Sequence, residues 1–424
     1  MRTRYREFLG VLIIICIAGM LTVLPPSVSA QEDDQKLLDG FLPYRNGSPQ
    51  VDGIAPSMTI TKENVQVTEK VLPPEIVRVV QAGDFEITVQ ATTDFPILKD
   101  YMQASIKNGG QVQLDADGEL QNYTVGQPFP LIDPADPQAG LKAAWNFRLR
   151  YLGDTMMAQG VFRIVNSSGG IERAVDTFYT RMYGMYRTNP KNDIEKWAKE
   201  GTWWREHSIV RSPQDLEGAQ SLTFHYAADT ADQKGWAYDP RSRRTRSIVV
   251  NHQAASFGAN YLIEDHAGFQ GYLHNHTWTY IGEQVVLVPG FIGGTPPEYG
   301  GKGGWYPQSP WELRKVVVLE ATPNNSGHPY GKRRFYLDRQ TYSAFYVFMY
   351  DWDGNHWRTL FHTFGNPADD PANADVKGTH LHLGNSCIDY KSNTAAVWSA
   401  DKIEINKPMK PRAFTIKHMM RLGK

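Results

Sequence analysis

The sequence predicts an α+β fold in which a strongly curved antiparallel sheet, a half-barrel, is closed by helices. Helical patterns are concentrated before residue 153, whereas short apparent strands follow one another from about residue 160 onward. Turn residues separate these strands, and the run at 351–355 is typical of a hairpin connection. Strands in succession, without a helix between each pair, favour an antiparallel sheet or partial barrel over βαβ units.

The first thirty residues have the three parts of a secretory signal peptide. Arg2, Arg4 and Arg6 form a basic start, residues 8–24 are apolar, and a small-residue pattern ends at Ala30. We expect cleavage after Ala30 and a mature chain that works outside the cytoplasm. The alternative is a retained membrane anchor, for which the apolar run is at the short limit.

Composition excludes some classes of protein. Residues 1–30 contain three Arg and one Glu, so cleavage changes the formal net charge from −1 to −3. A chain so close to neutral, without a dominant basic run, does not indicate nucleic-acid binding. Cys387 is the single cysteine of the mature chain, so no internal disulfide is expected.

The chain divides into a signal peptide at 1–30, an N-terminal extended and helical region at 31–130, and a curved β domain with a covering helix at 131–424. Within the second region, residues 31–58 are polar and rich in Gly and Pro, which indicates an extended lead-in. Helices are expected in two pieces over 61–82 and again over 96–107.

The strongest helix signal covers 137–152. Pro137 suits its first turn, and Leu141, Trp145 and Leu149 fall on one face. Core packing is the main interpretation of that face, with a ligand-facing Trp145 as the alternative. The expected strands are 161–165, 222–226, 283–288, 315–320, 333–338, 344–350 and 357–361.

The strand at 344–350 is apolar or aromatic on both of its faces. Both faces of the sheet should therefore be covered at this strand. On the strand at 222–226, Leu222, Phe224 and Tyr226 share one side, and Thr223 and His225 share the other.

Few residues point to catalysis or to a metal. The chain has neither a Gly-x-Ser-x-Gly elbow nor a His-Glu-x-x-His helix. Two His-x-His pairs, His274/His276 and His380/His382, could each direct two imidazoles to one side of a strand. Because no third ligand stands at a diagnostic spacing, we expect no metal and no cofactor.

A basic run at 241–246 suggests a surface contact. Its arginines could bind anionic headgroups or a partner protein, or they could simply protect a solvated strand edge. These residues are Arg241, Arg243, Arg244 and Arg246.

Six motifs occur in order and resemble one bacterial family, the domain of unknown function 1329. The resemblance covers roughly residues 128–363. The motifs are GLKAAWNFRLRYLGD (140–154), GWAYDPRSRRTRSI (235–248), WTYIGEQVVLVP (278–289), WELRKVVVLEAT (311–322), HPYGKRRFYLD (328–338) and YDWDGNHWR (350–358).

The resemblance implies kinship with the periplasmic lipoprotein carriers of the Lol system, whose curved sheet and helices enclose an apolar cavity. It also implies that the protein is located in a Gram-negative periplasm and has an inner-membrane transporter or an outer-membrane protein as a possible partner. It carries over no catalytic residues.

Three functions are therefore open. The first is a non-enzymatic periplasmic carrier of a lipid or other hydrophobic molecule. The second is an adaptor subunit of an envelope transporter complex without a ligand of its own, and the third is a metal-dependent hydrolase. Strand parity assigns the cavity of the carrier to Trp145, Leu149, Phe224, Trp236, Phe335, Phe345 and Trp357.

Overall fold

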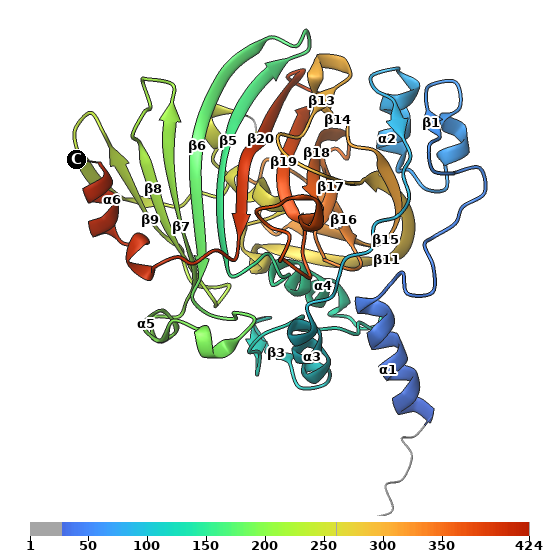
Figure 1. The fold of residues 1–424 in the computed structure, drawn as a ribbon, viewed down its shortest axis with the longest axis horizontal. Helices are drawn as coiled ribbons and strands as arrows, with labels where there is room; N and C mark the ends of the chain where they lie inside the picture. The colour runs from blue at the N-terminus through green and yellow to red at the C-terminus, as the bar shows by residue number, and fades with distance from the viewer. Residues whose placement is uncertain (1–27, 260, 424) are drawn as a thin grey trace, which may run out of the picture.

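One large antiparallel sheet organises the protein. The computed structural model describes residues 28–259 and 261–423. Of the fourteen strands of the sheet, all but β12 follow one another in the order β10-β9-β8-β7-β6-β5-β20-β19-β18-β17-β16-β15-β11, and β12 pairs with the end of β18. Figure 1 shows the strands fanning from β9 and β8 on the left to β15 on the right.

The strands of this sheet are long, as a sheet made mainly of consecutive hairpins allows. Their bounds are β5 (Thr155–Asn166), β6 (Ile171–Tyr183), β7 (Thr202–Ser212), β8 (Gln220–Tyr226), β9 (Lys234–Asp239), β10 (Arg244–Val249), β11 (His276–Pro289), β12 (Phe291–Ile292), β15 (Trp311–Pro323), β16 (Lys332–Asp338), β17 (Ala344–Tyr350), β18 (His356–Gly365), β19 (Leu381–Asp389) and β20 (Thr394–Ile405). Short pairs lie outside the sheet: β1 (Thr59–Ile60) with β2 (Ile87–Thr88), β3 (Gln113–Leu114) with β4 (Leu120–Gln121), and β13 (Tyr299–Gly300) with β14 (Tyr306–Pro307).

The expected strong curvature is wrong. The sheet is neither closed nor strongly curled, and β10 and β11 remain as its two separate edges. The physical reason is that the sheet does not need to wrap around a cavity by itself. A long connection between β10 and β11, residues 250–275, lies over part of one face and encloses space there.

Both faces of the central strands are buried, as the pattern at 344–350 predicts. All seven residues of β17 are buried. In β15, alternate residues belong to two separate cores: Val316 and Val318 pack with the N-terminal segments, whereas Val317 and Leu319 pack with α4 (Ala139–Arg148). The sheet therefore forms the middle layer of the molecule at these strands.

The helices match the sequence expectation in part. Pro74–Gln81 forms α2 with Pro74 at its start, Lys99–Asn108 forms α3, and α4 lies within the expected 137–152. The expected first piece of 61–82 is only a single 3₁₀ turn, Val65–Thr68. Two short helices, α5 (Glu195–Lys199) and α6 (Ile416–Leu422), supply buried residues to a core with β6, β8 and β9.

The extended lead-in expected at 31–58 is wrong for its first part. Helix α1 spans Val28–Phe41, and its residues Leu37 and Phe41 are buried. These two apolar residues are four apart, so they share one helical face that can pack against the body of the protein. Residues 1–27 of the expected signal peptide lie outside the described residues. Across the described ranges, no helix combines the length and apolarity needed to cross a membrane.

Gly140 allows α4 to approach the edge strand β11 closely. A Cβ atom at this position would lie 2.1 Å from the carbonyl oxygen of Trp278. We expect Gly140→Ala to lower the free energy of unfolding by about 1–3 kcal/mol, because the clash outweighs the roughly 1 kcal/mol gain in helix propensity. Urea unfolding measures this loss.

Gly327→Ala serves as the control, because Gly327 is exposed. The atom nearest to a Cβ added there would be Oδ1 of the Asn325 side chain, at 3.3 Å. This substitution should change the free energy of unfolding by no more than about 0.5 kcal/mol. Equal stability of Gly140→Ala and the parent protein would contradict the close contact.

Candidate functional site

A cavity of about 480 Å³ lies between one face of the sheet and the connection 250–275. Strands β5 to β8 and β18 to β20 provide one wall, and residues 250–270 provide the other. The lining is predominantly apolar, with Phe162, Phe257, Ile263, Phe364 and Trp398 among its large side chains. Its volume is within the range of small-molecule sites and about three times that of a dry cavity that takes up benzene.

Strand alternation decides which side chains reach the cavity. On β8, Thr223 and His225 face it, while Leu222 and Phe224 belong to the core beneath α6. The grouping of these residues by side, expected from the sequence, is therefore confirmed. The same alternation directs Tyr179 of β6 into the cavity.

The seven side chains assigned to a cavity by parity lie elsewhere. Trp145, Leu149 and Phe335 are buried in the core beside α4, and Phe345 is buried in the core on the other face. The rings of Phe224 and Trp236 lie 4.8 Å apart and tilted at 59°, with Arg205 over the Phe224 ring, and Trp357 donates a hydrogen bond to Asp389. None of the seven belongs to the lining of this cavity, because the parity argument chose the apolar faces that pack as core.

The residues that form the mouth of the cavity are exposed and come from the edge strand. Val249, at the end of β10, is 91% exposed, and Ile248 is also exposed. Both line the cavity, together with the exposed Asn251 and Ala255. An edge strand whose outer side is unpaired and whose apolar side chains are exposed is a typical contact surface.

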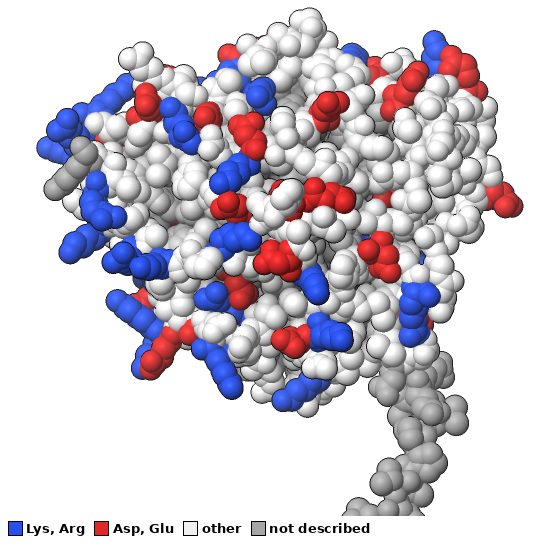
Figure 2. Space-filling model, in the orientation of Figure 1, with Lys and Arg blue, Asp and Glu red and all other residues white. Residues whose placement is uncertain are grey.

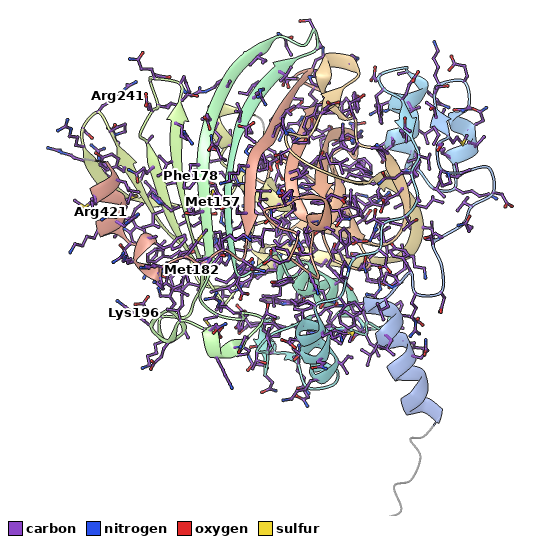
Figure 3. All side chains as sticks on the ribbon, in the orientation of Figure 1. Met157, Phe178, Met182, Lys196, Arg241 and Arg421 are labelled. Carbon is purple, nitrogen blue, oxygen red and sulfur yellow. The ribbon has the colours of Figure 1, made fainter. Side chains whose placement is uncertain are left out.

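The basic run begins in the turn before β10 and continues along that strand toward the mouth. Arg241, Arg243, Arg244 and Arg246 are all exposed, and Arg244 and Arg246 are in β10 itself. Figure 2 shows Lys and Arg gathered along the left margin, over this end of the sheet, whereas the rest of the visible face carries both signs. Figure 3 places Arg241, Arg421 and Lys196 along the same margin.

The inner part of the cavity contains three histidines: His380 and His382, which form the second His-x-His pair of the sequence, and His362, which the sequence did not single out. His362 and His380 are buried, and neither ring nitrogen of either side chain has a hydrogen-bond partner among the described residues. The rings of His362 and His382 lie 5.2 Å apart. Burial, followed by neighbouring histidine and arginine charges, lowers the pKa of all three, that of His382 to about 3, so they are neutral at pH 7.

Three other polar side chains on the cavity wall, Tyr179, Glu206 and His225, are hydrogen-bonded to one another through Glu206. Tyr179 donates to Glu206 at 2.8 Å, and His225 pairs with the other Glu206 oxygen at 3.1 Å. The His225 ring stacks on Trp204 at 3.5 Å. Burial raises the pKa of Glu206, but His225 and Tyr179 outweigh it and hold that pKa below its ordinary value, so the carboxylate is charged.

The cover of the cavity is fastened to the sheet through Arg333 of β16. Its guanidinium bonds Glu264 and lies 3.2 Å from Asp265, two acids of the connection 250–275. Asp265 also accepts from Tyr330 at 2.8 Å, and all these side chains are buried. Burial raises the pKa of Glu264, but Arg333 and His328 outweigh it and lower that pKa to about 2.

Glu264, His276 and His328 have the spacing of a metal site, with ligand atoms within 4.8 Å of one another. Their atoms are already occupied. The Tyr330 N–H donates to Nδ1 of His328 at 2.9 Å, and Nε2 of the same ring bonds Glu264 at 2.5 Å. Nε2 of His276 faces Arg333 at 3.3 Å. The guanidinium therefore supplies the cation of this cluster.

The two His-x-His pairs lie in different surroundings. His274 pairs with Asp229 at 2.9 Å, whereas His276 points into the Arg333 network. His380 and His382 both line the cavity. Only the second pair therefore faces a space that a ligand can enter, and its partner in space is His362.

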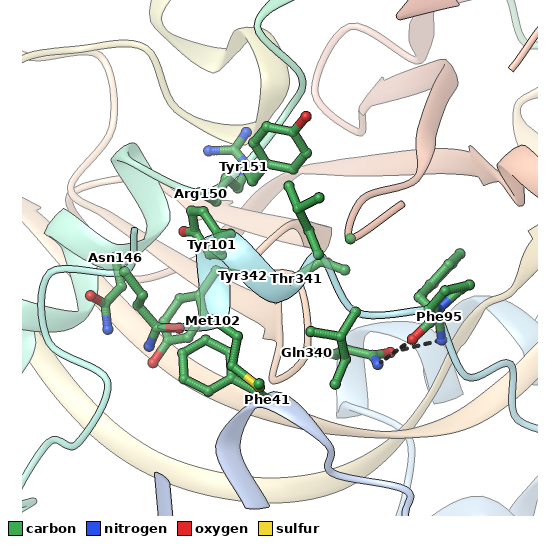
Figure 4. A pocket seen from close by; sticks show the side chains of 15 residues that line it. Phe41, Phe95, Tyr101, Met102, Asn146, Arg150, Tyr151, Gln340, Thr341 and Tyr342 are labelled. Atoms are coloured by element: carbon green, nitrogen blue, oxygen red, sulfur yellow. Dashed lines mark hydrogen bonds between the residues drawn. The ribbon is translucent and has the colours of Figure 1, made fainter. Parts of the chain in front are cut away.

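Arg150 separates this cavity from a smaller one. The smaller cavity, of about 40 Å³, lies between α1, α3 and the turn before β17, and is large enough for water. Figure 4 shows Phe41, Tyr101 and Tyr342 around it, with Arg150 at its rim.

A family model described as "Protein of unknown function (DUF1329)" matches residues 59–419. The chain belongs to this family. The match extends beyond the 128–363 covered by the sequence motifs and includes all fourteen strands of the large sheet.

Several bacterial proteins are similar to this DUF1329 chain. The uncharacterized protein PA3922 of Pseudomonas aeruginosa is 25% identical over 336 residues, which cover 75% of this chain and 70% of the relative. A solved DUF1329 family protein from Desulfovibrio piger has a TM-score of 0.47 and 14% identity, over 67% of this chain and 100% of that one. A LolA superfamily protein from Nitrosomonas europaea has a TM-score of 0.37 and 11% identity, over 66% and 98%.

Loss of the Arg333 charge should release the cover of the cavity. Arg333→Met leaves the buried Glu264 and Asp265 without their cation, and we expect a loss of about 3–5 kcal/mol in the free energy of unfolding. Arg334→Ala is the matched control, because Arg334 pairs with Glu320 at a half-buried site where ion pairs contribute about 0–1 kcal/mol. Urea unfolding and hydrogen exchange over 250–270 measure both effects. Equal losses in the two variants would contradict this role.

Acid should destabilise the protein below pH 6.5. Burial is the main cause that lowers the pKa of His252 and His276 to about 4 and of His382 to about 3, from an ordinary 6.5. The unfolded chain therefore binds more protons between pH 6.5 and 4, and the free energy of unfolding falls as the pH falls through that window. Each histidine contributes a slope of up to about 1.4 kcal/mol per pH unit.

Urea unfolding at several pH values measures this slope. His382→Gln should reduce the slope between pH 6 and 5, since it removes one of the neutral buried imidazoles. An unchanged slope in that variant would show that His382 is not held neutral.

Proposed function

We propose that this chain is a non-enzymatic carrier, or chaperone, of a lipid or other hydrophobic molecule in the periplasm. The observation that supports the proposal is the cavity of about 480 Å³ between the sheet and its cover, with its predominantly apolar lining. Each methylene group moved from water into such a space contributes about 0.8 kcal/mol, so an acyl chain needs few polar contacts to be held. The signal-peptide pattern of residues 1–30 supports export.

The mouth of the cavity also fits a carrier. Exposed Val249 and Ile248 give an apolar entrance, and the arginines of 241–246 lie beside it. We propose that this edge contacts anionic headgroups or a membrane protein when the ligand enters or leaves. An inner-membrane transporter or an outer-membrane protein would supply such a contact.

An adaptor that has no ligand remains the second candidate, because an unpaired edge strand such as β10 can extend the sheet of a partner. The metal-dependent hydrolase has less support. In the group with metal-ligand spacing, Glu264 and His276 contact Arg333, and His328 bonds Glu264 and the Tyr330 N–H.

The carrier is tested by filling its cavity. Thr223 faces the cavity from β8, and Thr223→Trp should weaken uptake of a fluorescent fatty-acid probe at least ten-fold, which corresponds to about 1.4 kcal/mol. Thr223→Val keeps the volume of the side chain and should change the affinity by less than two-fold. Native mass spectrometry of the purified protein should also show bound lipid.

Two results would contradict the carrier. One is the absence of both bound lipid and probe uptake in the parent protein. The other is full uptake by a folded Thr223→Trp variant, which would place the probe elsewhere. Recovery of a membrane partner by ligand-free protein, combined with the first result, would favour the adaptor.

A further inference from the structure

We propose that the ligand is an amphiphile with a single negative charge, and that Arg150 holds its anionic oxygen group at the inner end of the cavity. This inference rests on the proposed carrier function and names the class of its cargo. The apolar tail would lie along the lining toward the mouth at β10.

The charges on the cavity wall do not balance. Its charged side chains are Arg150, Arg181 and Glu206, which leave a surplus of one positive charge while the lining histidines are neutral. Isolated charge in an apolar space is costly unless it is paired. A ligand with one negative charge would neutralise the surplus, whereas a neutral ligand would leave it buried and uncompensated.

Arg150 is the buried arginine on which this surplus is concentrated. Its Nη1 donates to the Phe147 carbonyl at 2.5 Å and its Nη2 to the Ala267 carbonyl at 2.8 Å, while its Nε has no partner. Among the described residues, no carboxylate lies within ion-pairing distance of Arg150, which is only 8% exposed. Burial lowers the pKa of its guanidinium to about 10, so it is still charged at pH 7.

Other buried arginines of this fold are paired. Arg314 bonds Glu312 and Asp338, Arg333 bonds Glu264 and Asp265, and Arg358 bonds Asp389. Arg181, which also lines the cavity, contacts the Leu152 carbonyl at 3.4 Å and the Met156 sulfur at 3.8 Å, and lies over the rings of Tyr183 and Trp204, but it forms no ion pair within the described residues. Among the buried arginines that the structure describes, the two without a carboxylate partner are thus the two that face the cavity.

Other buried hydrogen-bond donors that line the cavity also have no partner. The Nε atoms of Arg150 and Arg181, the Nδ2 of Asn385 and the rings of His362 and His380 are buried without a hydrogen bond in the described part of the chain, and all five side chains line the cavity. A buried donor without an acceptor costs about 1–3 kcal/mol. Most of these groups donate, so they suit a group made of acceptor oxygens.

Position also favours the headgroup at this end. Arg150 and His362 are buried, whereas the lining residues Val249 and Ala255 at the mouth are exposed. The charge is therefore held where water is excluded, and its attraction to an anion is strongest there. A carboxylate or a phosphodiester carries the single charge that the surplus requires, and a free fatty acid or a phospholipid could supply it.

The test compares ligands that share a chain and differ in charge. Hexadecanoate and a lysophosphatidylglycerol of the same chain length supply the carboxylate and the phosphodiester, hexadecan-1-ol is the neutral analogue, and hexadecyltrimethylammonium is the cation. Each displaces a bound fluorescent probe from the mature protein at pH 8, below its micellar concentration. We expect at least one anion to bind ten-fold tighter than the alcohol, and the cation to bind weakest. The anion that binds more tightly shows whether the cavity prefers the carboxylate of a fatty acid or the phosphodiester of a phospholipid.

Arg150→Met should reduce the preference for the anion over the alcohol to less than two-fold, while Arg150→Lys, which keeps the charge, should retain most of it. If Arg150→Met does not fold, Arg181→Met tests the charge surplus instead, because it removes one positive charge from the lining and should lower the preference for the anion. The comparison of ligands on the parent protein decides the question even without a variant.

Equal binding of anion and alcohol by the parent protein would overturn this inference and leave the carrier function standing. A preference unchanged in a folded Arg150→Met variant would also overturn it. If none of the four amphiphiles displaces the probe, or the probe itself is not bound, the carrier function fails as well.

Discussion

The contact between Arg333 and the two acids of the connection 250–275 is the interaction on which the cavity depends. It joins β16, the third strand from the β11 edge of the sheet, to the segment that forms the opposite wall. The sheet alone is open and not strongly curled, so it does not enclose a cavity without that segment. A fully buried ion network is a costly way to fasten a cover, but it defines one position for it, because any displaced acid would be left without its cation.

The same charge rule explains why the cavity differs from the cores on either side of the sheet. In the core, the buried Arg314 has the carboxylate partners Glu312 and Asp338. In the cavity, no carboxylate of the described residues pairs with Arg150, and the rings of His362 and His380 have no hydrogen-bond partner there. Groups that fold stability does not explain are expected at functional sites, where a ligand completes them.

Much of the fold follows from local patterns. The apolar faces of β17 require cover on both sides, and the structure buries both. The Pro and apolar spacing of 137–152 predicts α4, and the sides of β8 are grouped correctly. The strong curvature expected from the sequence is wrong and the seven residues assigned to a cavity lie elsewhere, because both depend on where residues 250–275 fold back. Short-range periodicity contains no signal for that, although His380 and His382 stand out in the sequence as a His-x-His pair.

The sequence by itself predicted seven of the fourteen strands of the large sheet, the grouping of side chains by face and the family, and it raised the expectation of export. Only the tertiary structure decided which face is core and which is cavity. The physical reason is that a period of two residues separates the faces of a strand without saying what covers each. The aromatic side of β8, with Phe224, packs as core beside Arg205, and the polar side, with Thr223 and His225, lines the cavity.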